Sequence, residues 1–308
     1  MINERYSFRA TGDQADRRLD RVLRGLFRDV PLGAVMKSIR NGSVRVNGRK
    51  ASGDFRLSAG DEVAVPWTRD ARGIISDNND EENAGGDLTL STLFRNEFLW
   101  CVDKPPGLLA QPDEPGGDSV ITRAWHMLGW KRDDFRPAVT GRLDRNVSGV
   151  TAIALTYPAL RAISEHMRNG AVKKIYRAVV YGKIPETGRI DIPLVKDGRR
   201  NIVCAARPGD SGMDSLTLFR RIRFKSPYSL AEIELVTGRP HQARAHLALL
   251  GFPIAGDEKY GFERHARSFP RPMLHAYSLS FPDDSSLPGI EGLTIKSPMP
   301  GQFISFFV

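Results

Sequence analysis

Residues 228–246 read Tyr-Ser-Leu-Ala-Glu-Ile-Glu-Leu-Val-Thr-Gly-Arg-Pro-His-Gln-Ala-Arg-Ala-His. In the first half, apolar Ala231, Ile233 and Leu235 alternate with two glutamates. This alternation predicts a strand with one buried face and one solvated face. Strands of this kind, joined by separate helices, favour an α+β fold with a mostly antiparallel sheet over a parallel βαβ array.

The second half of this stretch predicts a loop that runs into a helix with Pro240 in its first turn. We expect Ala243, Leu247 and Leu250 to face the core and Arg244 to point into a cleft. The two histidines of the stretch, at 241 and 246, are five residues apart, which is a helical rotation of ~500°. They cannot share one ligand face, so we expect no metal site here.

Further elements of the same domain follow from short patterns. Residues 98–102 and 150–155 read as buried strands, and helices are expected at 119–128 and 158–168. Together they predict a small N-terminal module followed by an α+β domain whose central, mostly antiparallel mixed sheet is flanked by helices.

Length and charge place limits on the function. The chain has 308 residues, with 45 Lys plus Arg against 36 Asp plus Glu, a net charge of +9. This length predicts two domains, and the positive charge suggests a polyanionic partner such as nucleic acid. Its two cysteines form no C-x-x-C pair, which excludes a disulfide scaffold or a thiol zinc cage.

Targeting and cofactor motifs are lacking in the sequence. We find no signal peptide and no apolar run of ~18 residues, so we expect a cytoplasmic protein without a membrane partner. No G-x-G-x-x-G, Walker or H-E-x-x-H motif occurs, so we expect no nucleotide cofactor and no metal. The default oligomeric state is a monomer.

An acidic, Asn- and Gly-rich stretch divides the chain. Residues 68–92 are expected to form a flexible linker between a small domain at 14–67 and a large domain at 93–308. The sequence of the small domain predicts two helices and a β-hairpin with its turn at Asn47-Gly48. Its candidate RNA-binding residues lie along the helices and the hairpin: Arg17, Arg18, Arg21, Lys37, Arg40 and Arg45. Ordinary solvated helix faces would explain these charges equally well.

The order of motifs in the small domain is more specific than its charge. The strings RLDRVL, IRNGSVRVNG and LSAGDEV resemble the S4 RNA-binding module. Where many S4 modules have Ser-Arg before the second helix, this chain has Pro31-Leu32. The resemblance implies a module that binds RNA.

Four segments of the large domain carry the residues that could do chemistry. They are Lys104–Gly107, Gly141–Gly149, Lys174–Gly182 and Thr237–His246. In the second segment Asp144 stands between two arginines, and a carboxylate in such a place is expected to stay ionised. A structural ion pair is the simpler reading of that aspartate taken alone.

In this order, the four segments resemble the RluA family of pseudouridine synthases, which has K-P-x-G, R-L-D-x-x-x-S-G, K-x-Y-x-A-x-V-x-G and T-G-R-x-H-Q-x-R-x-H-L motifs. The later G-x-P-I-x-G-D-x-x-Y-G and L-H-A-x-x-L-x-F-P motifs match residues 251–261 and 274–282. Gly141 departs from the family, most of which has His there. Within the family the chain is most similar to the RluC-type branch, which modifies large-subunit ribosomal RNA of the 23S type.

The resemblance assigns roles to four residues. Asp144 would be the catalytic carboxylate, and Arg244 would pair with it. Tyr176 would stack on the target base, and Arg142 would fill the place that the flipped base leaves. The family needs neither a cofactor nor a metal, and the sequence does not choose between attack on C1′ or C6 and abstraction of the C2′ proton.

Two other function classes are alternatives to this one. A non-catalytic S4-type RNA-binding or ribosome-assembly protein would be favoured by the loss of Asp144, Tyr176 or Arg244, and all three are present. A metal-dependent nuclease or hydrolase would need a cluster of carboxylates and histidines on one face.

Overall fold

A computed structural model describes residues 6–27, 30–67, 89–114, 116–130, 135–198, 202–207, 209–261, 269–305 and 307. The chain divides into two compact units. The first comprises Met1–Leu88 with two short pieces, Met127–Arg136 and Thr156–Pro158, and the second comprises the remainder. The division after Leu88 falls inside the segment 68–92 that was expected to be a linker, of which residues 68–88 lie outside the described part.

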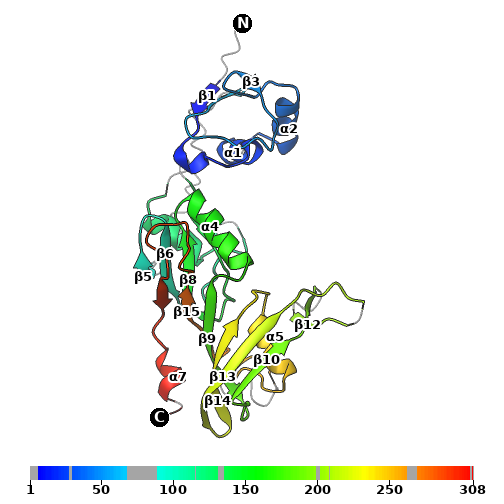
Figure 1. Cartoon of the computed structure of the whole chain (residues 1–308), viewed down its shortest axis with the longest axis vertical. Helices are drawn as coiled ribbons and strands as arrows, with labels where there is room; N and C mark the ends of the chain where they lie inside the picture. Colours follow the sequence, from blue (N-terminus) through cyan, green and yellow to red (C-terminus); the bar gives the residue numbers. More distant parts are fainter. Residues whose placement is uncertain are drawn as a thin grey trace. The chain divides into compact units, whose positions relative to one another are not determined.

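The first unit combines a small antiparallel sheet with two helices (Figure 1). The sheet has the order β1-β4-β2-β3. Its elements are β1 Tyr6–Arg9, a 3-10 turn at Gly12–Gln14, α1 Leu19–Leu26, α2 Leu32–Arg40, β2 Arg45–Val46, β3 Arg49–Lys50 and β4 Glu62–Val65. The hairpin turn between β2 and β3 is at Asn47 and Gly48, which both have positive φ, as the Asn-Gly pair predicts.

The core of the first unit forms because apolar side chains recur at helical spacing along α1. Leu19, Val22 and Leu23 pack on Val35 and Ile39 of α2 and on the valines of β2 and β4. Two expectations need correction. α1 begins at Leu19, so Arg17 and Arg18 precede it rather than lie on it, and β1, which pairs with β4, lies before the expected domain start at residue 14.

The second unit is built on a large mixed sheet with the order β10-β13-β14-β9-β15-β8-β6-β5, to which β16 and β7 add at β15 and β8 (Figure 1). Its strands are β5 Ser91–Arg95, β6 Leu99–Lys104, β7 Ala138–Val139, β8 Ser148–Ala154, β9 Lys173–Tyr181, β10 Thr187–Asp191, β13 Leu216–Lys225, β14 Tyr228–Leu235, β15 Leu274–Ser280 and β16 Thr294–Lys296. The pairing of β15 with β8 is parallel, and the other pairings described are antiparallel. The expected α+β fold with a mostly antiparallel mixed sheet is therefore confirmed.

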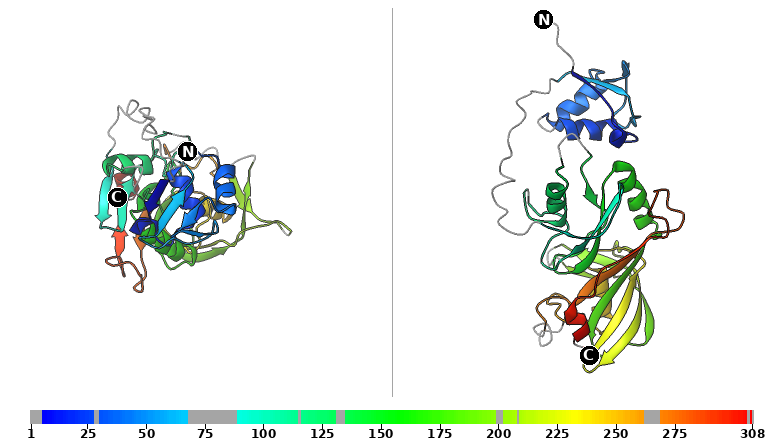
Figure 2. Two further views of the ribbon diagram at one scale, coloured as in Figure 1. Left: turned by 90° about the horizontal axis from the view of Figure 1, so that it is seen from above. Right: turned by 90° about the vertical axis from the view of Figure 1, so that its left-hand side faces the viewer.

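Among the described residues, a separate hairpin and four helices complete this unit. They are β11 Leu194–Asp197 with β12 Ile202–Ala205, and α3 Val120–Met127, α4 Tyr157–Arg168, α5 Gln242–Leu249 and α7 Gly301–Ser305. Figure 2 shows β9, β13, β14 and β15 side by side in a second view. Because β5 starts at Ser91, the sheet begins two residues before the expected domain start at 93.

Two apolar clusters hold helices against the sheet. Ala159 and Ile163 of α4 pack with Val150 and Ala152 of β8. On the other part of the sheet, Ala243 and Leu247 of α5 pack with residues of β9 and β14, including Ala231, Ile233 and Leu235. The alternation in residues 228–236 thus predicts the buried face of β14 correctly.

The start and end of α5 differ from the expectation. The helix begins at Gln242 with His241 as its N-cap, so Pro240 lies before the helix rather than in its first turn. Leu250 is the residue after the helix and is exposed, because the chain turns away there through Gly251 at a φ of 88°. In the part of the chain that the structure describes, no helix is long and apolar enough to cross a bilayer.

Candidate active site

Asp144 lies in the loop that connects β7 to β8, and the backbone of this loop is held by a hydrogen bond within it and by close packing at its end. Within the loop, the Val147 amide donates to the Asp144 carbonyl at 3.0 Å. At its end, Gly149 has a φ of 115°, and a Cβ there would lie 2.2 Å from the Ala276 carbonyl oxygen of β15. Only glycine allows this approach, which explains the Ser-Gly pair that follows the aspartate.

Lys104, at the end of β6, anchors the same loop. Its side chain is fully buried, and its ammonium donates to the carbonyls of Pro105, Leu108 and Arg145 at 2.9, 2.6 and 2.9 Å. Burial lowers the pKa of Lys104 to about 7, while the nearby charge of Asp144 acts in the opposite direction. The lysine of the K-P-x-G motif thereby connects the backbone of Arg145, the residue after Asp144, to the end of β6.

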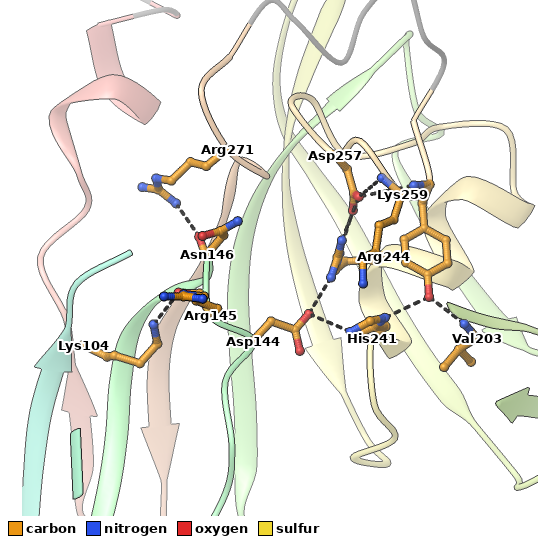
Figure 3. Close-up of polar contacts among 11 residues, drawn as sticks. Lys104, Asp144, Arg145, Asn146, Val203, His241, Arg244, Asp257, Lys259 and Arg271 are labelled. Carbon is orange, nitrogen blue, oxygen red and sulfur yellow. Dashed lines mark hydrogen bonds and ion pairs between the residues drawn. The ribbon is translucent and has the colours of Figure 1, made fainter. Parts of the chain in front are cut away.

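Arg244 of α5 joins two carboxylates (Figure 3). Its Nε and Nη2 donate to Asp257 at 2.7 and 2.8 Å, and its Nη1 donates to Oδ2 of Asp144 at 2.8 Å. Burial opposes a charge here, but the hydrogen bonds and charge of Asp257, followed by Asp144, raise the pKa of Arg244 above its usual value. The guanidinium is thus a fixed positive charge beside Asp144.

Asp257 is fully buried and holds Arg244 from behind. Its Oδ1 also accepts the backbone amides of Lys259 and Tyr260 at 3.1 and 3.3 Å. We did not single out this aspartate from the sequence, although it belongs to the G-x-P-I-x-G-D-x-x-Y-G motif. Its place in that motif, directly after Gly256, is the indication that the sequence offers.

The arginines next to Asp144 in the sequence do not make its ion pair. Arg145 turns away, and its Nε donates to the Gly107 carbonyl at 3.0 Å. Arg142 is exposed and lines the cavity. The expectation that these two neighbours flank the carboxylate is therefore wrong. Arg244, one hundred residues further along the chain, contacts it instead, because α5 packs against the sheet next to the loop.

A cavity of about 390 Å³ opens in front of these groups and brings the four expected site residues together. Asp144, Arg142, Tyr176 and Arg244 all line it, together with Leu143, Leu274 and residues of the β11–β12 hairpin. Tyr176 projects from β9 on the face of the sheet that carries Ile233 of β14. Burial raises the pKa of Tyr176, and the charge of Asp144 adds to this effect, so the phenol is neutral.

His241 is a further polar residue of the cavity that the sequence did not assign. Its Nε2 lies 3.8 Å from Oδ2 of Asp144, and its Nδ1 lies 3.0 Å from the hydroxyl of Tyr260. Burial lowers the pKa of His241, with Asp144 acting in the opposite direction. His246, by contrast, is buried away from this point, against Thr217 and the Ile192 carbonyl. Within the described residues, no three His, Cys, Asp or Glu side chains lie where they could hold a metal ion.

The candidate RNA-binding residues of the first unit lie in or next to its helices and its hairpin. Five are exposed and one, Arg17, is half-buried; the exposed ones are Arg18, Arg21, Lys37, Arg40 and Arg45. Arg18 is paired with Asp20 at 3.0 Å, and Arg45 donates to the Gly48 carbonyl. Arg21 and Lys37 project from the exposed sides of α1 and α2.

The comparisons with known proteins identify the family of the chain. Residues 98–249 match the model of a family described as RNA pseudouridylate synthase. An uncharacterized RNA pseudouridine synthase of Chloroflexus aurantiacus is 32% identical over 270 residues, 85% of this chain and 81% of that protein. The chain belongs to the RluA family of RNA pseudouridine synthases. It is an enzyme of the class that isomerises uridine to pseudouridine, so family membership does not favour the non-catalytic alternative.

Relatives named for their substrate are similar over nearly the whole chain. The ribosomal large subunit pseudouridine synthase C of Escherichia coli K12 is 30% identical over 302 residues, 94% of this chain and 91% of that protein. Among solved structures, human RNA pseudouridylate synthase domain containing 1 superposes with a TM-score of 0.56. It is 22% identical and covers 72% of this chain and 96% of its own, which supports the fold.

Proposed function

We propose that this enzyme isomerises specific uridines in large-subunit ribosomal RNA and that Asp144 is the carboxylate that reacts. The observation that carries the role of Asp144 is its place in the cavity, where the buried Arg244–Asp257 pair holds one of its oxygens. The choice of RNA is supported by relatives named as large-subunit synthases over most of the chain.

The reaction breaks the N1–C1′ bond, turns the freed uracil and joins C5 to C1′. No group is oxidised and none is transferred to another molecule, so the chemistry asks for a carboxylate rather than a redox group. Asp144 would attack C1′ or C6, or would take the C2′ proton. In each route Arg244 keeps the carboxylate oriented and charged, because its other two donors are fixed on buried Asp257.

The target base must leave its stack to reach Asp144, at a cost of a few kcal/mol. Tyr176 offers the flipped uracil a neutral aromatic surface within the cavity. Arg142, which is exposed and lines the cavity, would enter the helix where the base was, and its planar guanidinium suits stacking between bases.

The first unit would supply further affinity as an S4-type RNA-binding domain that reaches from β1 to β4, and the catalytic domain would begin with β5 rather than at the expected residue 93. Arg17, Arg18, Arg21, Lys37, Arg40 and Arg45 are its candidate phosphate contacts. The proposed partner is RNA of the 23S type, bound by a monomer. Action on ribosomal RNA would place the enzyme in the cytoplasm.

The experiment that tests the choice of RNA is release of tritium from [5-³H]uridine-labelled transcripts, since C5 loses its hydrogen when it bonds to C1′. Large-subunit ribosomal RNA, small-subunit ribosomal RNA and transfer RNA are compared, with and without EDTA. We expect release from the large-subunit RNA, unchanged by the chelator. Release from transfer RNA alone would reject the proposed substrate but keep the enzyme class.

A further inference from the structure

His241 adopts a backbone conformation that is uncommon for a residue with a side chain. Its φ of 52° and ψ of 16° lie in the left-handed region, immediately before α5. Such a conformation persists where the surrounding structure holds it, and it gathers at functional sites. Here the turn lets α5 begin while the imidazole lies between Asp144 and Tyr260.

The partners of Tyr260 determine where the proton of His241 resides. The amide of Val203, in β12, donates to the Tyr260 hydroxyl oxygen at 2.7 Å. Among the described residues, Nδ1 of His241, at 3.0 Å, is the acceptor within reach of the hydroxyl proton. With Nδ1 as the acceptor of this bond, the neutral imidazole carries its proton on Nε2. Burial, which lowers the pKa of His241, favours the same neutral form.

The Nε2–H group faces one particular oxygen of Asp144. Both contacts that the described residues make to this carboxylate, from Arg244 at 2.8 Å and from His241 at 3.8 Å, fall on Oδ2 (Figure 3). At 3.8 Å the histidine contact is longer than a hydrogen bond. Catalytic hydrogen bonds are often long in the absence of substrate and shorten when it binds.

We propose that His241 is a positioning residue for Asp144. Tyr260 fixes it as the Nε2–H tautomer, and its Nε2–H closes onto Oδ2 when a uridine fills the cavity, leaving Oδ1 to react. This inference rests on the proposed function of Asp144. His241 transfers no proton in it; it shares Oδ2 with Arg244 and so sets the rotation of the carboxylate.

The same contacts connect the carboxylate to the β11–β12 hairpin. Val203 lines the cavity and its amide donates to the Tyr260 hydroxyl, so β12 contacts the residue that holds His241. The Cζ atom of Arg244 also lies over the Tyr260 ring, 5.1 Å from the centroid of that ring. This cation–π contact leaves the tyrosine ring little freedom to turn.

The first test reads the tautomer and needs no RNA. The full chain is labelled with ¹⁵N-histidine, and two-bond ¹H–¹⁵N correlations are recorded at neutral pH, with His241 assigned by its absence in His241→Gln. We expect the pattern of a neutral Nε2–H imidazole. In Tyr260→Phe, which keeps the ring but removes the hydroxyl, this pattern is expected to change to a mixture. A neutral Nδ1–H tautomer in the wild type would overturn the proposal.

The second test uses two substitutions at His241. They distinguish loss of the N–H donor from a change in the backbone conformation of this residue. Asparagine tolerates the left-handed conformation but is too short to reach Asp144, whereas glutamine has an N–H near the position of Nε2. In single-turnover tritium release, we expect His241→Asn to lower the rate constant about tenfold with an unchanged RNA concentration at half-saturation. His241→Gln should stay within about threefold of the wild type, the size expected if most of one hydrogen bond is kept.

Thermal unfolding of both variants checks that each is folded. Equal rates for asparagine and wild type, or equal losses for asparagine and glutamine, would overturn the positioning role. If the proposed function is wrong, the result differs from all of these, because the wild type itself would then release no tritium from any RNA. The spectra would in that case decide the inference. An Nε2–H tautomer in the wild type that changes to a mixture in Tyr260→Phe supports the fixing of His241 by Tyr260, and a wild type without the Nε2–H tautomer rejects it.

Discussion

The guanidinium of Arg244 donates hydrogen bonds to two carboxylates, and a lysine ammonium could not make the same set of bonds. Three of its N–H groups are placed on Asp257 and Asp144 at 2.7 to 2.8 Å. An ammonium is a point charge without this fork, so Arg244→Lys would keep the charge and lose the orientation. We expect kcat to fall about a hundredfold, which corresponds to losing one preorganised contact to the reacting group, with little change in KM.

Single-turnover tritium release measures this effect, and binding of RNA to the variant is the control. A rate constant for Arg244→Lys within about threefold of the wild type would show that the charge alone suffices.

Lys104 acts on a whole element, because it fixes the loop between β7 and β8. Its three hydrogen bonds to carbonyls include the one to Arg145, next to Asp144. Lys104→Met keeps the buried length of the side chain but leaves these carbonyls without their donor. We expect the free energy of unfolding to fall by about 2 kcal/mol and the activity to fall more than the binding of RNA.

Chemical denaturation and tritium release check the two parts of this prediction. Full activity in a destabilised Lys104→Met protein would mean that the loop keeps its shape without the lysine.

Buried histidines make the second unit sensitive to acid. Burial lowers the pKa values of His241, His246 and His275. A lowered pKa in the folded state means that the unfolded chain binds protons first, so this contribution to stability is complete above pH ~6.5 and is lost as the pH falls through the lowered values. We expect the melting temperature to drop between about pH 7.5 and about pH 5.5.

The matched variant for this prediction is His246→Gln. His246 holds α5 to β13 through Thr217 and also contacts the Ile192 carbonyl. Glutamine cannot take up the proton, so the variant should lose part of the pH dependence. An identical pH dependence in variant and wild type would rule out His246 as a contributor.

The elements show which parts of the fold local sequence determines. The alternation in 228–236 predicts β14 because its period reports directly which face is buried, and the Asn-Gly pair predicts the turn between β2 and β3. The partner of Asp144 could not be inferred from neighbouring residues. Arg145 stands next to Asp144 in the sequence, yet Arg244 reaches it because tertiary packing of α5 decides the contact. The order of the motifs predicts that Asp144, Tyr176 and Arg244 belong to one site. No local pattern identifies Asp257 as the second partner of Arg244.

At the scale of the whole chain, the net charge of +9 suits an RNA partner, and the proposed S4 module should carry a separable share of the affinity. Arg21 and Lys37 are exposed on α1 and α2. The double variant Arg21→Glu, Lys37→Glu should weaken RNA binding and reduce the slope of log affinity against log salt by about 2, one for each lost phosphate contact. The rate at saturating RNA should not change.

Filter binding between ~50 and ~200 mM salt measures the slope. A variant with unchanged affinity and slope would mean that these helix faces are solvated surfaces that do not contact the RNA.

The role of Asp144 is tested most directly by measuring the product of the reaction, pseudouridine. Large-subunit ribosomal RNA transcript is incubated with excess enzyme, digested to nucleosides and assayed for pseudouridine by liquid chromatography and mass spectrometry. We expect the wild type to form pseudouridine and Asp144→Asn, which keeps the shape of the side chain and still binds the RNA, to form none. Pseudouridine formed by Asp144→Asn at a rate near that of the wild type would contradict the assignment of Asp144 as the reacting carboxylate.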